Sequence, residues 1–228
     1  GAVSESNRDE VTRVGAKKII LATNGYAASR GLVAQYCPEI SGAEYFGARG
    51  STGEAVLWGR QLGAALANMA AYQGYATVAY PQGSIVSWTT VEKGGVLVDA
   101  SGARFGDEAG VGYSGYARHV LAAQAPVHVV FDERIRLIAY KEEEFHELME
   151  MKGGKRAASP RDLAAALGVD AVALERSLAA LTPPLYAVRV VPGLFHTQGG
   201  LLVDEQAHAL RPDGSIIANL FAGGGAAA

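Results

Sequence analysis

Short apolar runs that end in glycine turns are the sequence feature that most constrains how this chain can fold. Residues 19–23 read Ile-Ile-Leu-Ala-Thr and stop at Asn24-Gly25, and residues 216–221 are followed by Gly223-Gly224-Gly225. Apolar runs this short are typical of strands buried on both faces. Glycine lets a ligand or another strand approach the backbone closely, and 29 of the 228 residues are glycine. The pattern predicts strands whose ends lie against a ligand or other backbone, and a turn-rich fold is the alternative.

The composition excludes several classes of protein. Charged residues make up 19% of the chain and hydrophobic residues 49%, as in a globular protein, and the net charge of -3 argues against a nucleic-acid partner. The histidines lack metal-ligand spacing, and the single cysteine, Cys37, rules out an internal disulfide. We expect Cys37 to be a buried apolar residue. No apolar run approaches the ~20 residues of a membrane span, so we expect a soluble, cytoplasmic protein.

The clearest local signals predict a pair of short helices. Ser159 is a helix cap before Pro160 at the first helical position, and Gly168 ends the helix. Asp170 caps a second helix, which we expect to continue to Leu181. Further helices are predicted over residues 53–72 and 142–151. Further strands are predicted over 96–98, 127–131, 186–191 and 201–204, with a loop over 74–90.

The first candidate site is a predicted hairpin over residues 94–108. It presents Arg104 beside Phe105, with Asp107 and Glu108 close enough in sequence to pair with the guanidinium. A surface ion pair is one interpretation of such an arginine. The other is a fixed guanidinium fork that binds a substrate carboxylate or carbonyl. The residues alone leave both interpretations open.

The second candidate site is the segment 193–204, which contains His196-Thr197-Gln198-Gly199-Gly200. Three polar residues stand here between an apolar strand and two glycines. Paired glycines would let a planar ligand lie close to the backbone. A lone histidine is usually structural, but this setting favours a binding role for His196. By contrast, Gly112-Tyr113-Ser114-Gly115-Tyr116 lacks the glycine spacing of a nucleophile elbow.

Taken together and in order, these segments resemble the flavoprotein subunit family of fumarate reductase and succinate dehydrogenase. The likeness is greatest to the single-chain FAD-dependent dehydrogenases, which include tricarballylate and 3-ketosteroid dehydrogenases. Asn24 stands where the family's Ala-Thr-Gly-Gly element has its first glycine, and Gln73-Gly74-Tyr75 stands where many relatives have Gln-x-His-Pro. The segments that carry the resemblance are 16–26, 50–69, 94–108 with Gly-x-Arg-Phe-x-x-Glu, 193–204 with Thr-x-Gly-Gly, and 209–225.

The resemblance implies transfer of hydride between flavin N5 and a carbon of a small carboxylate or ketone substrate. It implies that Arg104 delivers a proton through an acid or orients the substrate, and that His196 holds a substrate oxygen. The implied substrate-binding residues are Tyr75, Thr197, Gln198 and Glu108. The implied cofactor-binding residues are Thr23, Asn24, Gly25, Gly199, Gly200, Gly223, Gly224 and Gly225. No metal is implied, and the electron partner is not indicated.

The family's N-terminal Gly-x-Gly-x-x-Gly unit and its C-terminal helix are absent from this sequence. We therefore expect a chain truncated at both ends, with FAD in the parent protein, weak or absent flavin binding in this chain, and little activity. A non-catalytic small-molecule-binding or structural capping domain is the alternative function. The expected fold class is α+β, and exposed sheet edges could drive self-association. The expected domains are a capping domain over 48–192, with a mixed sheet and the helical pair, and parts of an FAD-binding α/β domain over 1–47 and 193–228.

Overall fold

The computed structural model describes residues 2–7 and 10–228, and the chain divides into two compact units. The first unit comprises residues 1–41, 47–73 and 195–228, and the second comprises residues 42–46 and 74–194. Two of the four boundaries fall within strands, one in β6 (Tyr72–Ala79) and one in β10 (Leu185–Thr197). Residues 48–73 therefore group with the first unit. Which unit serves a flavin and which covers a substrate stays a prediction.

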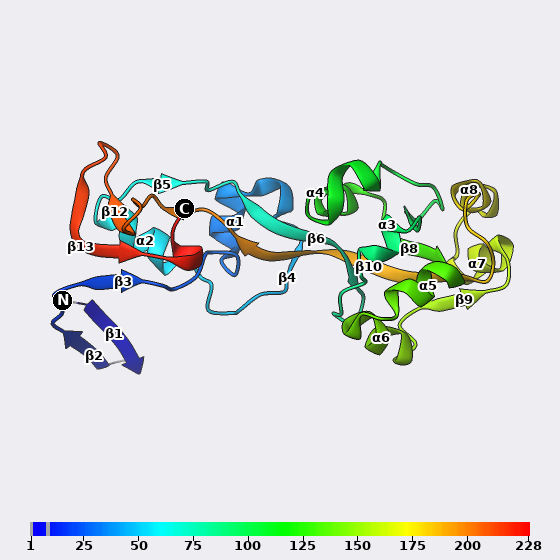
Figure 1. Cartoon of the computed structure of the whole chain (residues 1–228), viewed down its shortest axis with the longest axis horizontal. Helices are drawn as coiled ribbons and strands as arrows, with labels where there is room; N and C mark the ends of the chain where they lie inside the picture. The colour runs from blue at the N-terminus through cyan, green and yellow to red at the C-terminus, as the bar shows by residue number, and fades with distance from the viewer. Residues whose placement is uncertain (1, 8–9) are drawn as a thin grey trace. The chain divides into compact units, whose positions relative to one another are not determined.

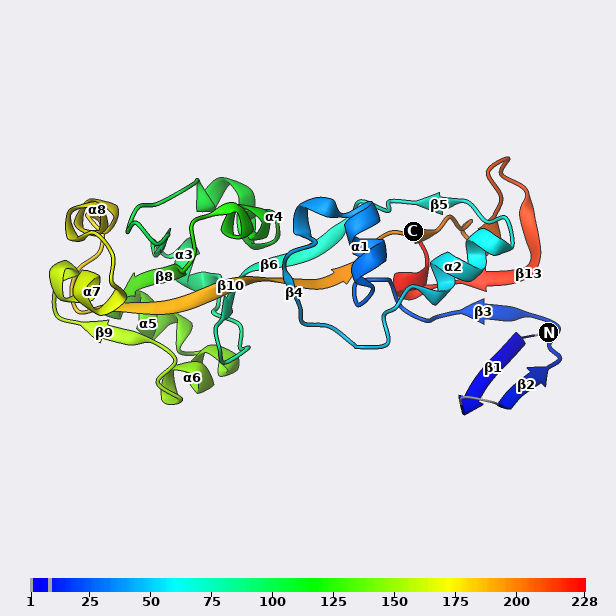
Figure 2. The same ribbon diagram turned by 180° about the vertical axis from the view of Figure 1, so that it is seen from behind.

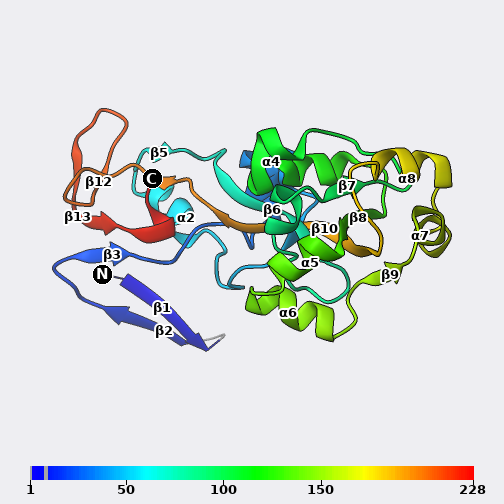
Figure 3. The ribbon, with the colours of Figure 1, turned by 45° about the vertical axis from the view of Figure 1, so that its right-hand side comes forward.

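The first unit contains small sheets and two short helices. Strands β12, β13 and β3 form one sheet, in which β13 and β3 are parallel neighbours (Figure 1). Strands β1 and β2 form a separate antiparallel hairpin (Figure 3), and β11 pairs with β5. Its strands are β1 (Ala2–Asn7), β2 (Glu10–Val14), β3 (Ile19–Leu21), β5 (Leu66–Ala67), β11 (Gly200–Leu201), β12 (His208–Leu210) and β13 (Ile216–Ala222). Its helices are α1 (Arg30–Tyr36) and α2 (Glu54–Gln61), with 3-10 turns η1 (Pro38–Ile40) and η2 (Gly224–Ala226).

The second unit is built on a mixed sheet. Strands run in the order β4-β10-β8-β7, with β6 and β9 also paired to β10, and the β4–β10 pair is parallel. The remaining strands are β4 (Glu44–Tyr45), β7 (Val96–Val98), β8 (Val127–Asp132) and β9 (Lys155–Ala157). The helices are α3 (Thr89–Glu92), α4 (Glu108–Ala122), α5 (Glu133–Ala139), α6 (Glu143–Glu150), α7 (Pro160–Leu167) and α8 (Ala171–Ser177).

Each face of the β8–β10 sheet has its own apolar core, because successive side chains of a strand point to opposite faces. On one face, Val130 and Leu185 pack with Leu163 of α7 and Leu174 of α8. On the other, Phe131 and Val188 pack among the apolar residues of α4, α5 and α6. Both strands are therefore mostly apolar, as expected for strands covered on two sides.

The helical pair is confirmed, and its caps explain why. Ser159 accepts a hydrogen bond from the Asp162 N–H at 3.1 Å, and Asp170 accepts one from the Ala173 N–H at 2.7 Å. Gly168 ends α7 with a φ of 73°, in the left-handed region that glycine tolerates. Figure 2 shows α7 beside both α8 and β9. The predicted strands at 96–98, 127–131, 186–191 and 216–221 and the helix at 142–151 are also present.

Several element predictions were wrong. The helix expected over 53–72 ends at Gln61, because Gly63 takes a φ of 80°. The predicted loop over 74–90 contains most of β6, whose interior Gly74 is needed because a Cβ there would lie 2.9 Å from the Cβ of Ala117. The second helix of the pair ends at Ser177, and the strand expected over 201–204 ends at Leu201.

Burial also departs from one expectation and agrees with another. Ile20 is 71% exposed, so β3 is not buried on both faces; it is an edge strand of a small sheet. Cys37 is buried as predicted, with its thiol 3.4 Å from the carbonyl of Met69, and burial raises the pKa of the thiol. Among the helices that the structure describes, none is long and apolar enough to cross a membrane.

Candidate functional site

The predicted cofactor residues of the first unit gather into one loop cluster, which we define as residues 23–25, 197–200 and 223–225. Strands β3 and β13 are parallel, with Leu21 opposite Ala222, so their carboxyl ends meet at one edge. The Gly223 N–H donates to the Leu21 carbonyl at 3.1 Å across this edge. Glycine turns after neighbouring parallel strands therefore lie together, as the sequence predicted. Ligands of α/β sheets commonly bind at such carboxyl ends.

Backbone packs on backbone inside the loop cluster. A Cβ on Gly200 would lie 2.5 Å from the carbonyl oxygen of Ala226, and one on Gly225 would lie 2.9 Å from the Gly25 nitrogen. A Cβ on Gly25 would overlap the hydroxyl of Thr197, and one on Gly199 would lie 2.5 Å from the Cα of Met69. Contacts within the chain are thus sufficient to require glycine at these four positions.

Two glycines of the cluster differ from the rest. A Cβ on Gly223 or on Gly224 would meet nothing within 4 Å. Gly223 has an extended backbone, with a φ of -158° that any residue can adopt. Neither packing among the described residues nor φ requires glycine at position 223, whereas Gly224 has a left-handed φ of 62° that itself favours glycine. The Cβ side of both residues faces open space at the end of β13, where a ligand could approach closely, although the Gly223 N–H donates to Leu21 and the Gly224 carbonyl accepts the Ala227 N–H.

Asn24 adopts the left-handed conformation that a glycine would adopt more easily. Its φ is 64°, and its Nδ2 donates to the Ser51 hydroxyl at 2.9 Å. Asparagine tolerates this region better than most residues because its short amide can bond locally. This explains how asparagine can replace the first glycine of an Ala-Thr-Gly-Gly turn.

The first unit also contains two buried oxygens without partners. Thr23 Oγ1 and Glu54 Oε2 have no hydrogen-bond partner among the described residues, although both atoms are buried. The other carboxylate oxygen of Glu54 accepts a hydrogen bond from Thr52. Buried polar atoms are normally satisfied, so unpaired ones call for a ligand, a water or another explanation.

The polar residues of segment 196–198 have different surroundings. His196 is half-buried, and its Nε2 lies 2.7 Å from the amide oxygen of Gln73, so we assign the proton to Nε2. Thr197 is 1% exposed, and its hydroxyl accepts the Tyr26 N–H at 3.0 Å. Gln198 is exposed, with its N–H bonded to the Ala71 carbonyl at 2.8 Å. The Thr197 hydroxyl thus has a role inside the protein, while Gln198 presents its side chain to solvent.

Arg104 and Glu108 belong to the second unit and form a forked ion pair. Arg104 Nη2 lies 2.5 Å from Glu108 Oε2, and Arg104 Nε donates to Oε1 at 3.3 Å. The Glu108 side chain is 2% exposed and that of Arg104 is 46% exposed. Glu108 also accepts the Leu97 N–H at 3.0 Å, which fixes the carboxylate. The hydrogen bonds that Arg104 donates to Glu108 raise the pKa of Arg104. The pairing with Glu108 is confirmed, whereas Asp107 caps the following helix by accepting the Gly110 N–H at 3.3 Å. Among the described residues the other guanidinium N–H groups have no hydrogen-bond partner and could reach a ligand.

The second unit also contains a group of tyrosines, of which Tyr75 was predicted as a substrate-binding residue and Tyr113 and Tyr116 were not. Tyr75 accepts the Trp88 N–H at 3.1 Å, and its ring centroid lies 5.1 Å from that of Tyr113. Burial raises the pKa of Tyr75 to about 12. The hydroxyl of Tyr116 is buried without a partner among the described residues, close to Gly106 beside Arg104. The sequence signal for Tyr113 and Tyr116 is their spacing within Gly112-Tyr113-Ser114-Gly115-Tyr116, a segment that lacks the glycine spacing of a nucleophile elbow.

Comparison with known proteins identifies the family. The family model described as "FAD binding domain" matches residues 1–228, which is the whole sequence. The chain belongs to the FAD binding domain family. The predicted resemblance to fumarate reductase and ketosteroid dehydrogenase flavoproteins is confirmed, since both kinds of protein occur among the relatives and similar structures of this FAD binding domain.

The relatives of this chain are longer than the chain itself. It is 28% identical over 242 residues to the NADH:fumarate oxidoreductase of Klebsiella pneumoniae, covering 96% of this chain and 26% of that protein. It is 26% identical over 243 residues to a probable fumarate reductase of Shewanella frigidimarina, covering 98% and 41%. A stretch of 46 residues is 48% identical to the 3-oxosteroid 1-dehydrogenase of Mycobacterium tuberculosis, covering 20% and 8%. The chain thus spans well under half the length of these relatives.

Solved structures share the fold. The open conformation of a flavocytochrome c3 fumarate reductase superposes with a TM-score of 0.75 at 23% identity, covering 95% of this chain and 42% of that one. The 3-ketosteroid delta1-dehydrogenase from Sterolibacterium denitrificans gives 0.71 at 20% identity, covering 97% and 50%. The mixed α/β fold is therefore shared with both of these proteins.

The residues of the loop cluster fit the flavin that the family name implies. A flavin is planar, polar at its edge, and needs backbone that approaches without side chains. Gly223 and Gly224 supply open backbone, and the unpartnered Thr23 Oγ1 supplies a buried hydroxyl. These residues fit such a group, and a flavin-contacting role for them stays a prediction.

Proposed function

We propose that this chain is a portion of an FAD-dependent oxidoreductase that transfers hydride between FAD and a carbon of a small carboxylate or ketone. The observation that carries the proposal is the match of the FAD binding domain family to the whole chain. The printed names of its relatives, fumarate reductases and 3-oxosteroid dehydrogenases, describe formation or reduction of a C–C double bond next to a carbonyl group. We extend that substrate class to this chain.

In the proposal, the first unit holds the flavin ring through the loop cluster. Gly223 and Gly224 offer their backbone, and the Thr23 hydroxyl donates to or accepts from a polar edge of the ring. FAD supplies the hydride chemistry when it is bound, while the protein supplies position and charge. His196, with Nε2–H committed to Gln73, can accept a hydrogen bond only at Nδ1. It would therefore bind a substrate hydroxyl more readily than a carboxylate while it is neutral.

The second unit would cover the substrate as a capping domain. Arg104 is effectively always protonated, so it cannot give up a proton without replacing it at once. Glu108 is an acid bonded to its guanidinium, and the Leu97 N–H donates to the same carboxylate oxygen that accepts Arg104 Nε. We propose that Arg104 orients a substrate oxygen. We also propose that any proton that Arg104 gives up to the substrate is replaced through Glu108. A cytoplasmic location and self-association through sheet edges remain predictions.

The test is a titration of the purified chain with FAD, followed by flavin fluorescence and by an absorption spectrum after gel filtration. Gly223→Val is the decisive variant, because its Cβ meets no protein atom and its backbone is already extended. We expect saturable but weak binding, with a Kd between about 1 µM and 1 mM, and a loss of at least roughly tenfold in the variant. The matched control is Gly15→Val, an exposed glycine of the same unit whose Cβ also meets nothing.

Two results would contradict the proposal. One is the absence of saturable binding up to about 1 mM FAD. A Kd of that size corresponds to a binding free energy of only about 4 kcal/mol. The other is an equal affinity in Gly223→Val and Gly15→Val, which would place the flavin away from the loop cluster. A non-catalytic binding module would instead bind succinate or a steroid ketone without any response to FAD.

A further inference from the structure

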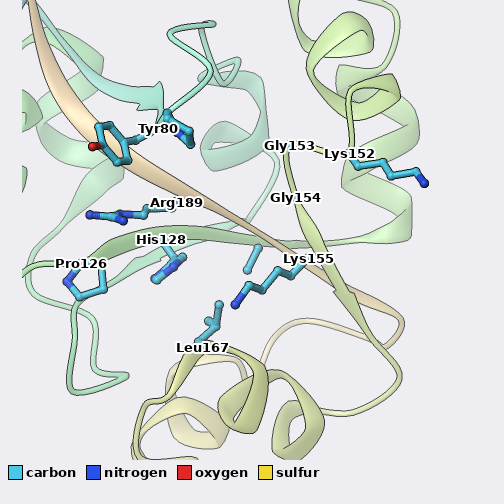
Figure 4. A pocket seen from close by; sticks show the side chains of 11 residues that line it. Tyr80, Pro126, His128, Lys152, Gly153, Gly154, Lys155, Leu167 and Arg189 are labelled. Carbon is cyan, nitrogen blue, oxygen red and sulfur yellow. The ribbon is translucent and has the colours of Figure 1, made fainter.

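A cationic pocket lies in the second unit, on the face of the sheet that α7 covers. Its volume is about 430 Å³. Lys155, Arg189 and His128 line it together with apolar walls from Pro126 and Leu167. Figure 4 shows the side chains of Arg189, His128 and Lys155 along one side of the pocket, while Lys152 extends away from them. None of the residues lining this pocket is acidic.

Strand register brings these three side chains to one face. His128 of β8 lies directly opposite Arg189 of β10, and Lys155 of β9 lies opposite Ala187. Opposite residues share a face, as do residues two apart on one strand, so all three point to the side that α7 covers. Toward the other end of β8 and β10 the same face carries Val130 and Leu185, both buried in the core. The pocket begins where that apolar core ends.

Each polar group of the pocket retains capacity for a ligand. The His128 residue is 6% exposed, and its Nδ1 is buried without a partner among the described residues. Lys155 Nζ donates to the carbonyl of Ala166 in the last turn of α7, which holds the ammonium and leaves two of its N–H groups. The Arg189 guanidinium lies over the Tyr80 ring, 4.5 Å from its centroid, with no carboxylate ion pair among the described residues.

We propose that this pocket binds the phosphate group of a small phosphate monoester. A guanidinium fork and an ammonium match the charge and the oxygens of a phosphate dianion, and the buried imidazole nitrogen adds a third polar contact. The volume of about 430 Å³ is many times the ~30 Å³ of one water, which leaves room for a phosphate group with an organic part. Pro126 and Leu167 would contact the organic part of the ligand. The proposal is independent of the flavin function, because it uses none of the residues assigned to that site.

Electrostatics supports this assignment. Burial, and then the charges of Lys155 and Arg189, lower the pKa of His128 to about 4, so the imidazole is neutral near pH 7. The groups that line the pocket around it are Tyr80, Lys152, Lys155 and Arg189, and none of them carries a negative charge at that pH. A bound dianion would offset the two cations and raise the pKa of His128.

The experiment is isothermal titration of the purified chain with phenyl phosphate and with inorganic phosphate, at constant ionic strength. We expect saturable binding, tighter for phenyl phosphate. Lys155→Gln and Arg189→Gln should each weaken it roughly tenfold or more, as for loss of a charge-assisted hydrogen bond. Lys152→Gln is the matched control, because it removes one charge from the same pocket lining but its ammonium points away (Figure 4). It should change the affinity less than about threefold.

A second readout is the imidazole NMR signal of His128, assigned by its absence in His128→Gln. Phosphate should raise the pKa of that histidine in the parent chain and shift it less in Arg189→Gln. Equal losses in Lys152→Gln and Lys155→Gln would overturn the proposal, because they would indicate diffuse attraction to surface charge. Succinate binding as tightly as phosphate would also overturn it. Preferential sedimentation with vesicles that contain phosphatidic acid, without binding of phenyl phosphate, would overturn the small-molecule assignment in favour of a lipid headgroup.

Discussion

The candidate site of the first unit is made of backbone, whereas those of the second unit are made of side chains. The loop cluster of the first unit is made of backbone, with glycines packed against carbonyls and amides and two more facing open space. The cationic pocket and the Arg104–Glu108 pair of the second unit are made of charged side chains fixed by strands and helices. The packed glycines of the loop cluster tolerate almost no added atoms, whereas a side-chain site tolerates changes of shape but not of charge. Substitutions at matched positions test this contrast.

The largest effect is expected where a methyl group enters the packed backbone. In Gly200→Ala, the new Cβ would lie 2.5 Å from the Ala226 carbonyl oxygen and 2.7 Å from its carbon. Backbone cannot move aside as a flexible side chain can, so the free energy of unfolding should fall by about 3 kcal/mol. Urea unfolding measures it. Gly223→Ala, with open space around the Cβ, should change it by less than about 0.5 kcal/mol, and equal losses would refute the distinction.

The next effect concerns the buried half of the ion pair. Glu108→Ala removes the acceptor of the Leu97 N–H and leaves Arg104 without its partner, so we expect a loss of about 2 kcal/mol in stability. Arg104→Ala should cost less, about 1 kcal/mol or below, because that side chain is 46% exposed and its charge is screened by solvent. Thermal unfolding of both variants checks the order. The reverse order would mean that Arg104 holds the hairpin together.

A third effect is a pH dependence specific to the second unit. The folded-state pKa of His128, about 4, lies below the ordinary value of 6.5. The unfolded state therefore binds this proton first, and stability is fully present above about pH 6.5 and is lost as the pH falls toward 4. One such group changes stability by at most about 1.4 kcal/mol per pH unit. His128→Gln should flatten the pH dependence between these values, as measured by urea unfolding. An unchanged slope in the variant would show that other groups cause it.

The same contrast explains how much could be predicted from the sequence. The helical pair was predictable because Ser159, Pro160 and Gly168 act on the turns beside them, and the Arg104–Glu108 pair spans only four residues. The glycine turns after β3 and β13 could be predicted to lie close together, because each turn directly follows a short apolar strand. The cationic pocket was not predictable, because His128 and Arg189 lie on strands far apart in sequence and meet only through register. The helix from Glu108 to Ala122 was hidden by its own glycines, one of which, Gly112, has a φ of 73°.

The smallest effect is expected at Asn24, where backbone and side-chain contributions oppose each other. Asn24→Gly removes the hydrogen bond to the Ser51 hydroxyl but relieves a left-handed φ of 64°, so the two changes should nearly cancel, within about 0.5 kcal/mol. Asn24→Ala removes the same bond and keeps the strain, which should cost about 1–2 kcal/mol. Urea unfolding of the two variants separates the terms. Equal losses of unfolding free energy in the two variants would mean that the hydrogen bond, and not the backbone conformation, favours asparagine at this position. The fumarate reductase-like flavoproteins have glycine there.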